Sequence, residues 1–190
     1  MTATRTFIAI ELDTATRAFM QMYVADLAST LPGIRFVDAA TWHITLAFLG
    51  DLSETEVAAA NAATLQATLG VVPFTLHTAG IGTFGGTQAP KIIWLGVGGD
   101  LPALDALHDR TIAALNDHGL TPDDLRFSPH ITLARVHASL SPVATDTLVE
   151  HIAEPTQGPA FTVDAISVMR SDRTPSGARY TALGRVPLKG

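Results

Sequence analysis

One pentapeptide occurs twice in this chain, and that repeat constrains the fold more than any other feature of the sequence. Residues 43–47 and residues 130–134 both read His-Ile-Thr-Leu-Ala, at an offset of 87 positions. Two further pairs keep the same offset, Phe74-Thr75 with Phe161-Thr162 and Phe7 with Trp94. Three matches in one register, without a net gap, indicate an internal duplication.

The pattern of apolar and polar residues predicts a similar order of elements in each half. Ser53 and Glu56 form a capping box at the start of one helix, and Gly70 ends it. Helices are expected over residues 14–30, 53–69, 101–118 and 141–153. Strands are expected over 5–12, 42–49, 73–81, 90–97, 129–136, 160–169 and 178–186, with a turn or loop at 171–177 that would close over a substrate.

This order predicts an α+β fold of two lobes related by a pseudo-twofold axis. Each lobe is expected to be an antiparallel sheet with helices on its outer face, and the two sheets should line a central cleft. The repeats cover about 5–81 and 92–168, and the strand 178–186 closes the set. Because the connection between the repeats is short and rich in strand residues, we expect a single domain over residues 1–190.

Composition narrows the range of functions. Hydrophobic residues make up 47% of the 190 residues, which is enough for a buried core, and the formal net charge is −6. A protein that coats long stretches of nucleic acid is usually basic, so we expect instead a pocket that grips one phosphate. Cysteine is absent, which excludes disulfides and thiolate metal sites. No window is apolar enough for a signal peptide or a membrane span, which predicts a cytoplasmic protein.

The repeated motif places polar side chains on one face of a strand. Alternate residues of a strand share a face, so His43 points with Thr45, and His130 points with Thr132. A twofold relation brings these two faces together around one small volume. One neutral imidazole can then take a proton from water while the other, protonated, gives one to a departing oxygen. The threonine hydroxyls and Arg135 could hold the non-bridging phosphate oxygens, and this scheme needs no metal or cofactor.

Other interpretations of these histidines are weaker. A single histidine on a strand is usually a core or surface residue with a satisfied hydrogen bond, but duplication of the polar pair in both halves argues for chemistry. Two histidines without an acidic or cysteine partner fall short of the three protein ligands of a catalytic zinc site. His77 has Asp164 as its counterpart, so the repeat does not support it. The remaining histidines, His108, His118, His137 and His151, are expected on the surface.

In longer segments around both motifs, the sequence resembles the bacterial and archaeal RNA 2′,3′-cyclic phosphodiesterases, or 2′-5′ RNA ligase-like proteins, of the two-histidine phosphoesterase superfamily. The similarity covers nearly the whole chain. The segments that carry it are 5–9, Thr41-Trp42-His43-Ile44-Thr45-Leu46-Ala47-Phe48-Leu49-Gly50, 91–97, Phe127-Ser128-Pro129-His130-Ile131-Thr132-Leu133-Ala134-Arg135, Arg170-Ser171, Gly177-Ala178-Arg179-Tyr180 and Pro187-Leu188.

The resemblance implies hydrolysis of a terminal RNA 2′,3′-cyclic phosphate to a 2′-phosphate. It also implies that His43 is the proton donor and His130 the acceptor, and that Phe48 contacts the terminal nucleotide while Arg135 contacts the phosphate. Simple strand alternation puts Phe48 and Arg135 on the face opposite the histidines. A bulge or the end of the strand would have to turn them inward, and a core role for Phe48 remains open.

Several functions remain in competition at this point. The expected partner is an RNA 3′ end with a cyclic phosphate, such as a tRNA half, or a small nucleotide, and weak 2′-5′ RNA ligation is expected as the reverse reaction. The alternatives are a nucleotide- or RNA-end-binding module without turnover and a phosphodiesterase for small cyclic nucleotides. Because an internal twofold supplies what a dimer would, we expect a monomer.

Overall fold

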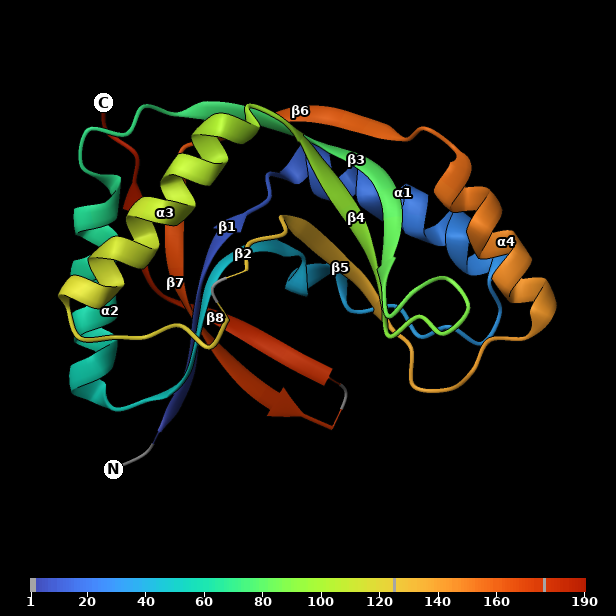
Figure 1. Cartoon of the computed structure of the whole chain (residues 1–190), viewed down its shortest axis with the longest axis horizontal. Helices are drawn as coiled ribbons and strands as arrows, with labels where there is room; N and C mark the ends of the chain where they lie inside the picture. Colours follow the sequence, from blue (N-terminus) through green and yellow to red (C-terminus); the bar gives the residue numbers. More distant parts are fainter. Residues whose placement is uncertain (1–2, 125, 176) are drawn as a thin grey trace.

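The computed structural model describes residues 3–124, 126–175 and 177–190. Strands and helices follow the predicted order, with one additional strand boundary near residue 164 (Figure 1). The elements are β1 (Thr4–Glu11), α1 (Thr14–Thr30), β2 (His43–Leu52), α2 (Glu54–Thr68), β3 (Phe74–Phe84), β4 (Ile92–Gly99), α3 (Leu101–Asp117), β5 (His130–Arg135), α4 (Pro142–Ala153), β6 (Gln157–Val163), β7 (Ala165–Thr174) and β8 (Gly177–Pro187). None of the helices within these ranges is long and apolar enough to cross a membrane.

The strands form two four-stranded antiparallel sheets, which confirms the predicted α+β architecture. One sheet has the order β2-β1-β7-β8 and the other β5-β4-β3-β6. Each sheet therefore combines strands from both halves of the chain, because β3 pairs with β4 and β7 pairs with β1. Helices α2 and α3 lie beside the first sheet, and α1 and α4 lie beside the second (Figure 1).

Local signals explain where α2 begins and ends. The Ser53 hydroxyl accepts from the backbone N–H of Glu56, and the Glu56 carboxylate accepts from the backbone N–H of Ser53, which confirms the capping box. Gly70 follows α2 with a φ of 69°, a left-handed conformation that glycine adopts without strain. The chain then leaves the helix and enters β3.

The apolar core is continuous across the two sheets. Ile8 and Ile44 from the first sheet and Ile93 and Ile131 from the second are fully buried and belong to one cluster. A smaller apolar cluster lies on the opposite face of β1, where Phe7, Ala9 and Met169 pack with Phe48 and Tyr180. We call these five residues the inner cluster. The first sheet therefore separates the inner cluster from the main core.

Two expectations near the C-terminus are wrong. The single strand expected at 160–169 is two strands in different sheets, β6 and β7, because the chain crosses over at Asp164. Most of the loop expected at 171–177 is also strand, since β7 continues to Thr174 and β8 starts at Gly177. Ser176, within the segment expected as a loop, lies outside the described residues. After Met169 the residues of β7 are mostly polar, so the sequence gives no strand signal there. The hairpin of β7 and β8 nevertheless continues through backbone pairing to Thr174 and Gly177.

Candidate active site

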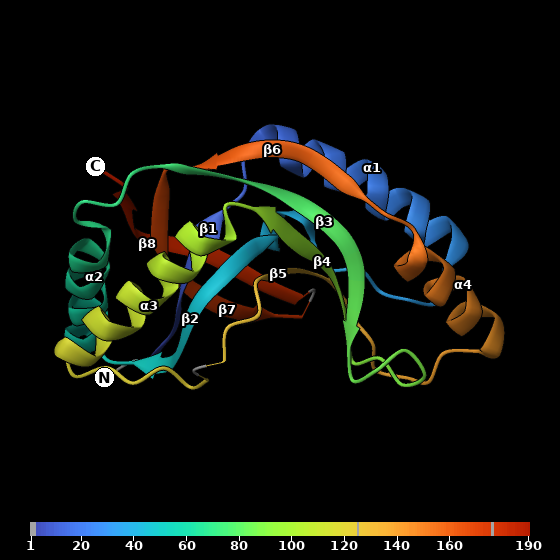
Figure 2. The ribbon, with the colours of Figure 1, turned by 45° about the horizontal axis from the view of Figure 1, so that its top comes forward.

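The two His-x-Thr motifs lie on strands that meet between the sheets. Strands β2 and β5 are the edge strands of their respective sheets. They are also in contact with each other, as the second view of the ribbon shows (Figure 2). An edge strand leaves one side of its backbone unpaired, and here each edge is partly covered by a loop from elsewhere in the chain. The Val37 N–H donates to the Leu133 carbonyl, and the Asp123 N–H donates to the Phe48 carbonyl.

A bulge interrupts each motif strand at the same repeat position. Between β1 and β2, Ile8 pairs with Ala47 but Ala9 pairs with Thr45, so Leu46 is the extra residue. Between β4 and β5, Ile93 pairs with Ala134 but Trp94 pairs with Thr132, so the extra residue is Leu133. Leu46 and Leu133 are themselves 87 positions apart. The duplication therefore extends to a backbone irregularity as well as to the side chains.

The bulges reverse the alternation of side chains along both strands. In β2, His43, Thr45, Phe48 and Gly50 are half-buried, whereas Leu46 and Ala47 are both buried. The same pattern occurs in β5, where Arg135 is exposed after two buried residues. Simple strand alternation is therefore wrong for Phe48 and Arg135, which lie on the same face as the motif histidines. Phe48 belongs to the inner cluster and not to the main core.

Each imidazole is anchored through the same ring nitrogen. Nδ1 of His43 lies 2.7 Å from the Thr41 carbonyl oxygen, and Nδ1 of His130 lies 2.7 Å from the Ser128 carbonyl oxygen. Because a carbonyl only accepts, Nδ1 must carry the proton in both rings. In the neutral form, Nε2 then holds a lone pair that can accept a proton. Nε2 of His43 lies 2.9 Å from the Thr45 hydroxyl.

Aromatic rings hold both imidazoles in place. The His43 ring lies 4.8 Å from Phe7 and 5.2 Å from Tyr180, measured between centroids. The His130 ring lies 4.9 Å from Phe84 and 6.3 Å from Trp94. Phe7 and Trp94 are counterparts in the repeat, so this support is duplicated as well. These rings also reduce the contact of the imidazoles with water.

Burial shifts the acid–base properties of both histidines. It lowers the pKa of His43 to about 4; the Thr41 carbonyl opposes the shift, and the charges of His130, Arg17 and Arg135 add to it. It also lowers the pKa of His130, where the Ser128 carbonyl opposes the shift and the Arg135 charge adds to it. The imidazole of His43 is therefore acted on by charged groups of the other motif strand. Both rings are neutral at pH 7 in the free protein.

Three residues of this region were not singled out by the motif analysis. Arg17 donates from its guanidinium to the carbonyls of Leu12, Ala39 and Trp42, and so holds the segment that leads into His43. The guanidinium of Arg5 lies over the ring of Phe48, 4.6 Å from its centroid. Burial raises the pKa of Tyr180, which the charges of Arg135 and Arg5 oppose. Of these three, Tyr180 and Arg5 lie in segments that carry the family resemblance, and no sequence signal singles out Arg17.

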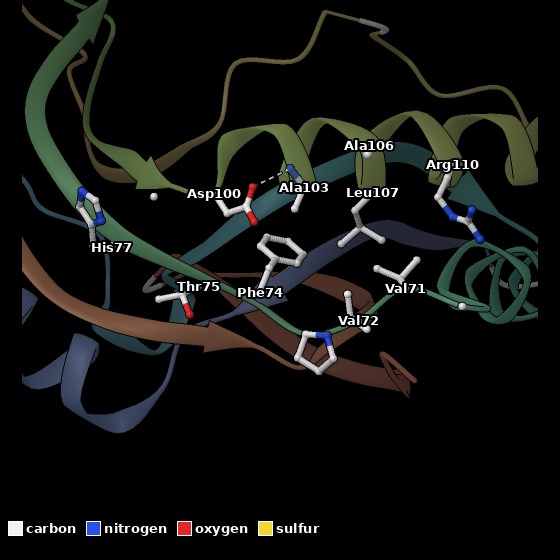
Figure 3. Close-up of a pocket in the computed structure, with 13 residues that line it drawn as sticks. Val71, Val72, Phe74, Thr75, His77, Asp100, Ala103, Ala106, Leu107 and Arg110 are labelled. Atoms are coloured by element: carbon white, nitrogen blue, oxygen red, sulfur yellow. Dashed lines mark hydrogen bonds between the residues drawn. The ribbon is translucent and has the colours of Figure 1, made fainter. Parts of the chain in front are cut away.

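The other histidines lie away from this pair. His77 lines a separate cavity between the α2–β3 connection and α3, together with Phe74, Asp100 and Leu107 (Figure 3). The expectation that His108 lies on the surface is wrong, because it is buried and stacks on Phe127 with 4.1 Å between ring centroids. His108 lies on the buried face of α3, which packs against the core. Within the described ranges, no three histidine, cysteine or acidic side chains group closely enough to hold a metal ion.

The lowered pKa values predict an acidic optimum for general acid–base catalysis by this pair. If the two imidazoles act as an acid–base pair, one must be protonated and the other neutral, so kcat/KM should fall below about pH 4, where both are protonated in the free enzyme, and should fall again above the lowered pKa of His130, where both are neutral. We expect a bell-shaped profile with its maximum below pH 6.5. The kcat profile should lie at higher pH, because a bound phosphate anion raises both pKa values. A kcat/KM that keeps rising above pH 8 would contradict this assignment.

A two-lobed α+β fold that brings one His-x-Thr strand from each lobe to a common face defines the class of two-histidine phosphoesterases. The chain belongs to the 2′-5′ RNA ligase superfamily, whose family model matches residues 24–175.

Named relatives and solved structures agree with this family. An RNA 2′,3′-cyclic phosphodiesterase of Geobacillus stearothermophilus is 33% identical over 97% of this chain, although the match spans only 57% of that protein's length. One of Aeropyrum pernix is 29% identical, covering 84% of this chain and 89% of the relative. The crystal structure of TT0787 of Thermus thermophilus covers 98% of both chains with a TM-score of 0.81 and 25% identity. E. coli LigT complexed with 3′-AMP shares the fold, with a TM-score of 0.75, 24% identity and full coverage of both chains.

Proposed function

We propose that this protein hydrolyses a 2′,3′-cyclic phosphate at an RNA 3′ end to a 2′-phosphomonoester, using His43 and His130 as an acid–base pair. The observation that carries the proposal is the identical Nδ1 anchoring of the two imidazoles. It leaves both Nε2 atoms as the reactive nitrogens, on strands that contact each other. A module that only binds nucleotides has no need for two matched, oriented proton carriers. The names of the curated relatives support the substrate.

The proposed reaction is a single in-line displacement at phosphorus. Nε2 of neutral His130 accepts a proton from the attacking water, and a new bond forms between the water oxygen and phosphorus. The bond between phosphorus and O3′ breaks, and Nε2 of protonated His43 donates its proton to O3′. The product keeps its phosphate on O2′. The assignment of donor and acceptor, and hence of the leaving oxygen, rests on the family resemblance.

The remaining groups stabilise the transition state. The Thr45 hydroxyl lies beside Nε2 of His43, and Thr132 occupies the equivalent position on β5. Both can donate to non-bridging oxygens, where negative charge grows. Arg135 is exposed, and its charge acts on both imidazoles, so it can also meet the phosphate. Phe48 offers an apolar ring beside the site for the terminal base.

Binding of an anionic substrate also explains how His43 becomes protonated. With a pKa of about 4 in the free protein, His43 is neutral at pH 7 and cannot donate. A phosphate anion placed next to the ring favours the imidazolium form and raises this pKa. Binding of the substrate thus prepares the acid that the reaction needs. A 5′-hydroxyl of a second RNA can replace water as the nucleophile: a bond between its oxygen and phosphorus forms, the bond between phosphorus and O3′ breaks, and the product is a 2′-5′ linkage, which gives weak ligation.

Product analysis of a short RNA with a 2′,3′-cyclic end tests the proposal. In the presence of EDTA we expect complete conversion to a product heavier by one water molecule, which co-elutes with the authentic 2′-phosphate in anion-exchange chromatography. A 3′-phosphate product would reverse the roles of the two histidines. Tight binding without conversion would instead identify a binding module, and loss of activity in EDTA would contradict the metal-free scheme.

A further inference from the structure

Comparison of the two repeats reveals an exchange of one arginine between neighbouring strands. In the second sheet the cation is on the motif strand, where Arg135 pairs across to Ile92. In the first sheet the motif strand has Phe48 at the position that corresponds to Arg135, and the cation is on β1, where Arg5 corresponds to Ile92. The two lobes therefore present one arginine each at the site, but at different distances from their histidines along the chain.

The side chain of Arg5 is held in place without an acidic partner. Its guanidinium packs 4.6 Å from the centroid of the Phe48 ring, an arrangement that orients the planar group and leaves its N–H donors available. Among the described acidic residues none forms an ion pair with Arg5, although Asp51 lies opposite it in the strand register. Its charge opposes the upward shift of the Tyr180 pKa, so it lies close to the inner cluster.

A polar cavity adjoins Arg5 where two strands separate. The pairing of β1 with β7 stops at Thr6 and Arg170, and the strand ends beyond it enclose a cavity of about 510 Å³. Arg5 of β1 and Arg173 of β7 both line this cavity. Asp172, also at the cavity, is 3.0 Å from the guanidinium of Arg170 and therefore already has a cationic partner.

The balance of charge around this cavity favours an anion. Arg5 and Arg173 face one nearby acid without an ion pair, Asp51, in a chain whose formal net charge is −6. Arg173 is four residues beyond Met169 on β7, and strand alternation places it on the same face as the inner cluster. An arginine fork matches the geometry of phosphate oxygens and binds them with two parallel hydrogen bonds.

We propose that Arg5, assisted by Arg173, binds the phosphodiester on the 5′ side of the terminal nucleotide. This inference rests on the proposed function. With the cyclic phosphate at the histidines and the terminal base against Phe48, the 5′ oxygen would lie one ribose away from the reacting phosphorus, and Arg5 is the cation that packs on the Phe48 ring. The contact would make the enzyme selective for an RNA end over a free nucleoside 2′,3′-cyclic phosphate, which lacks this phosphodiester.

The test compares kcat/KM for two substrates that share the reacting nucleotide. One is cytidine 2′,3′-cyclic phosphate, and the other is the dinucleotide UpC with the same cyclic end. We expect the wild-type protein to prefer the dinucleotide, and Arg5→Ala to reduce this preference about tenfold. Arg5→Lys should retain part of the preference, Arg173→Ala should reduce it less, and raised salt should reduce it in the wild type. Lys189→Ala, which removes one positive charge beside Leu69 at the end of α2, should leave the ratio unchanged.

The possible outcomes separate the subsite from the proposed function. An unchanged ratio in Arg5→Ala, or an equal loss on both substrates, would overturn the subsite and leave the proposed function standing. A wild-type protein without preference for the dinucleotide would overturn it as well. A wild-type protein that hydrolyses neither substrate would overturn the proposed function and the subsite together.

Discussion

Replacement of His130 by alanine is expected to lower kcat for hydrolysis of the cyclic phosphate by about 10²–10⁴-fold, and replacement of His43 is expected to do the same. Each change removes one of the two proton transfers, while the aromatic rings, the threonines and Arg135 remain to bind substrate. KM should therefore change much less than kcat. Because both proton transfers belong to one displacement, kcat of the double variant should be only slightly lower than kcat of the less active single variant.

A matched histidine provides the control for this experiment. His118, at the C-terminal end of α3, is exposed and pairs with the side chain of Gln66. His118→Ala should keep wild-type kcat, and thermal unfolding should show that all variants are folded. If either motif variant retains wild-type turnover, the acid–base assignment fails.

The second large effect is expected at Arg135. Arg135→Ala should lower kcat/KM by about 10²–10³-fold, because it removes a charged donor from oxygens that gain negative charge in the transition state. Arg135→Lys should recover part of this loss, since it restores the charge without the bidentate fork. Steady-state kinetics on the cyclic dinucleotide, with Lys189→Ala as the charge control, measure both effects.

The same variant has a readout that a purely structural role would not produce. The charge of Arg135 lowers the pKa of both His43 and His130. Its removal should therefore raise both values and move the maximum of the kcat/KM profile to higher pH. A large loss of activity with an unchanged pH maximum would show that Arg135 acts elsewhere. Unchanged activity would remove it from the site altogether.

The sequence predicted most elements of the fold because their signals are local. Each predicted helix is present, and the capping box at Ser53 and the stop at Gly70 lie at the ends of α2 as expected. Strand pairing is not local, and this is where prediction was limited. The repeat suggested that the halves of the chain would correspond to the sheets, but β3 and β7 each pair with strands from the other half. No periodicity in residues 74–84 or 165–174 distinguishes the two arrangements.

Prediction of the candidate site was limited by the backbone. The repeat identified both motifs, yet the side on which Phe48 and Arg135 lie depends on bulges at Leu46 and Leu133. The sequence around each bulge has the pattern of a regular strand. Only the folded backbone shows that the alternation of side chains between the two faces is reversed. Tyr180 reaches His43 from β8 and has no counterpart in the duplication, since the matching position is Ile93. Its place depends on tertiary structure alone.

A crystal structure with the product, a nucleoside 2′-phosphate, tests most directly whether one phosphate engages both lobes. We predict that Nε2 of His43 and Nε2 of His130 each lie within about 2.6–3.2 Å of an oxygen of the same phosphate group or of the released O3′ hydroxyl. A phosphate bound against one imidazole alone, or held in the cavity beside α3, would contradict the account.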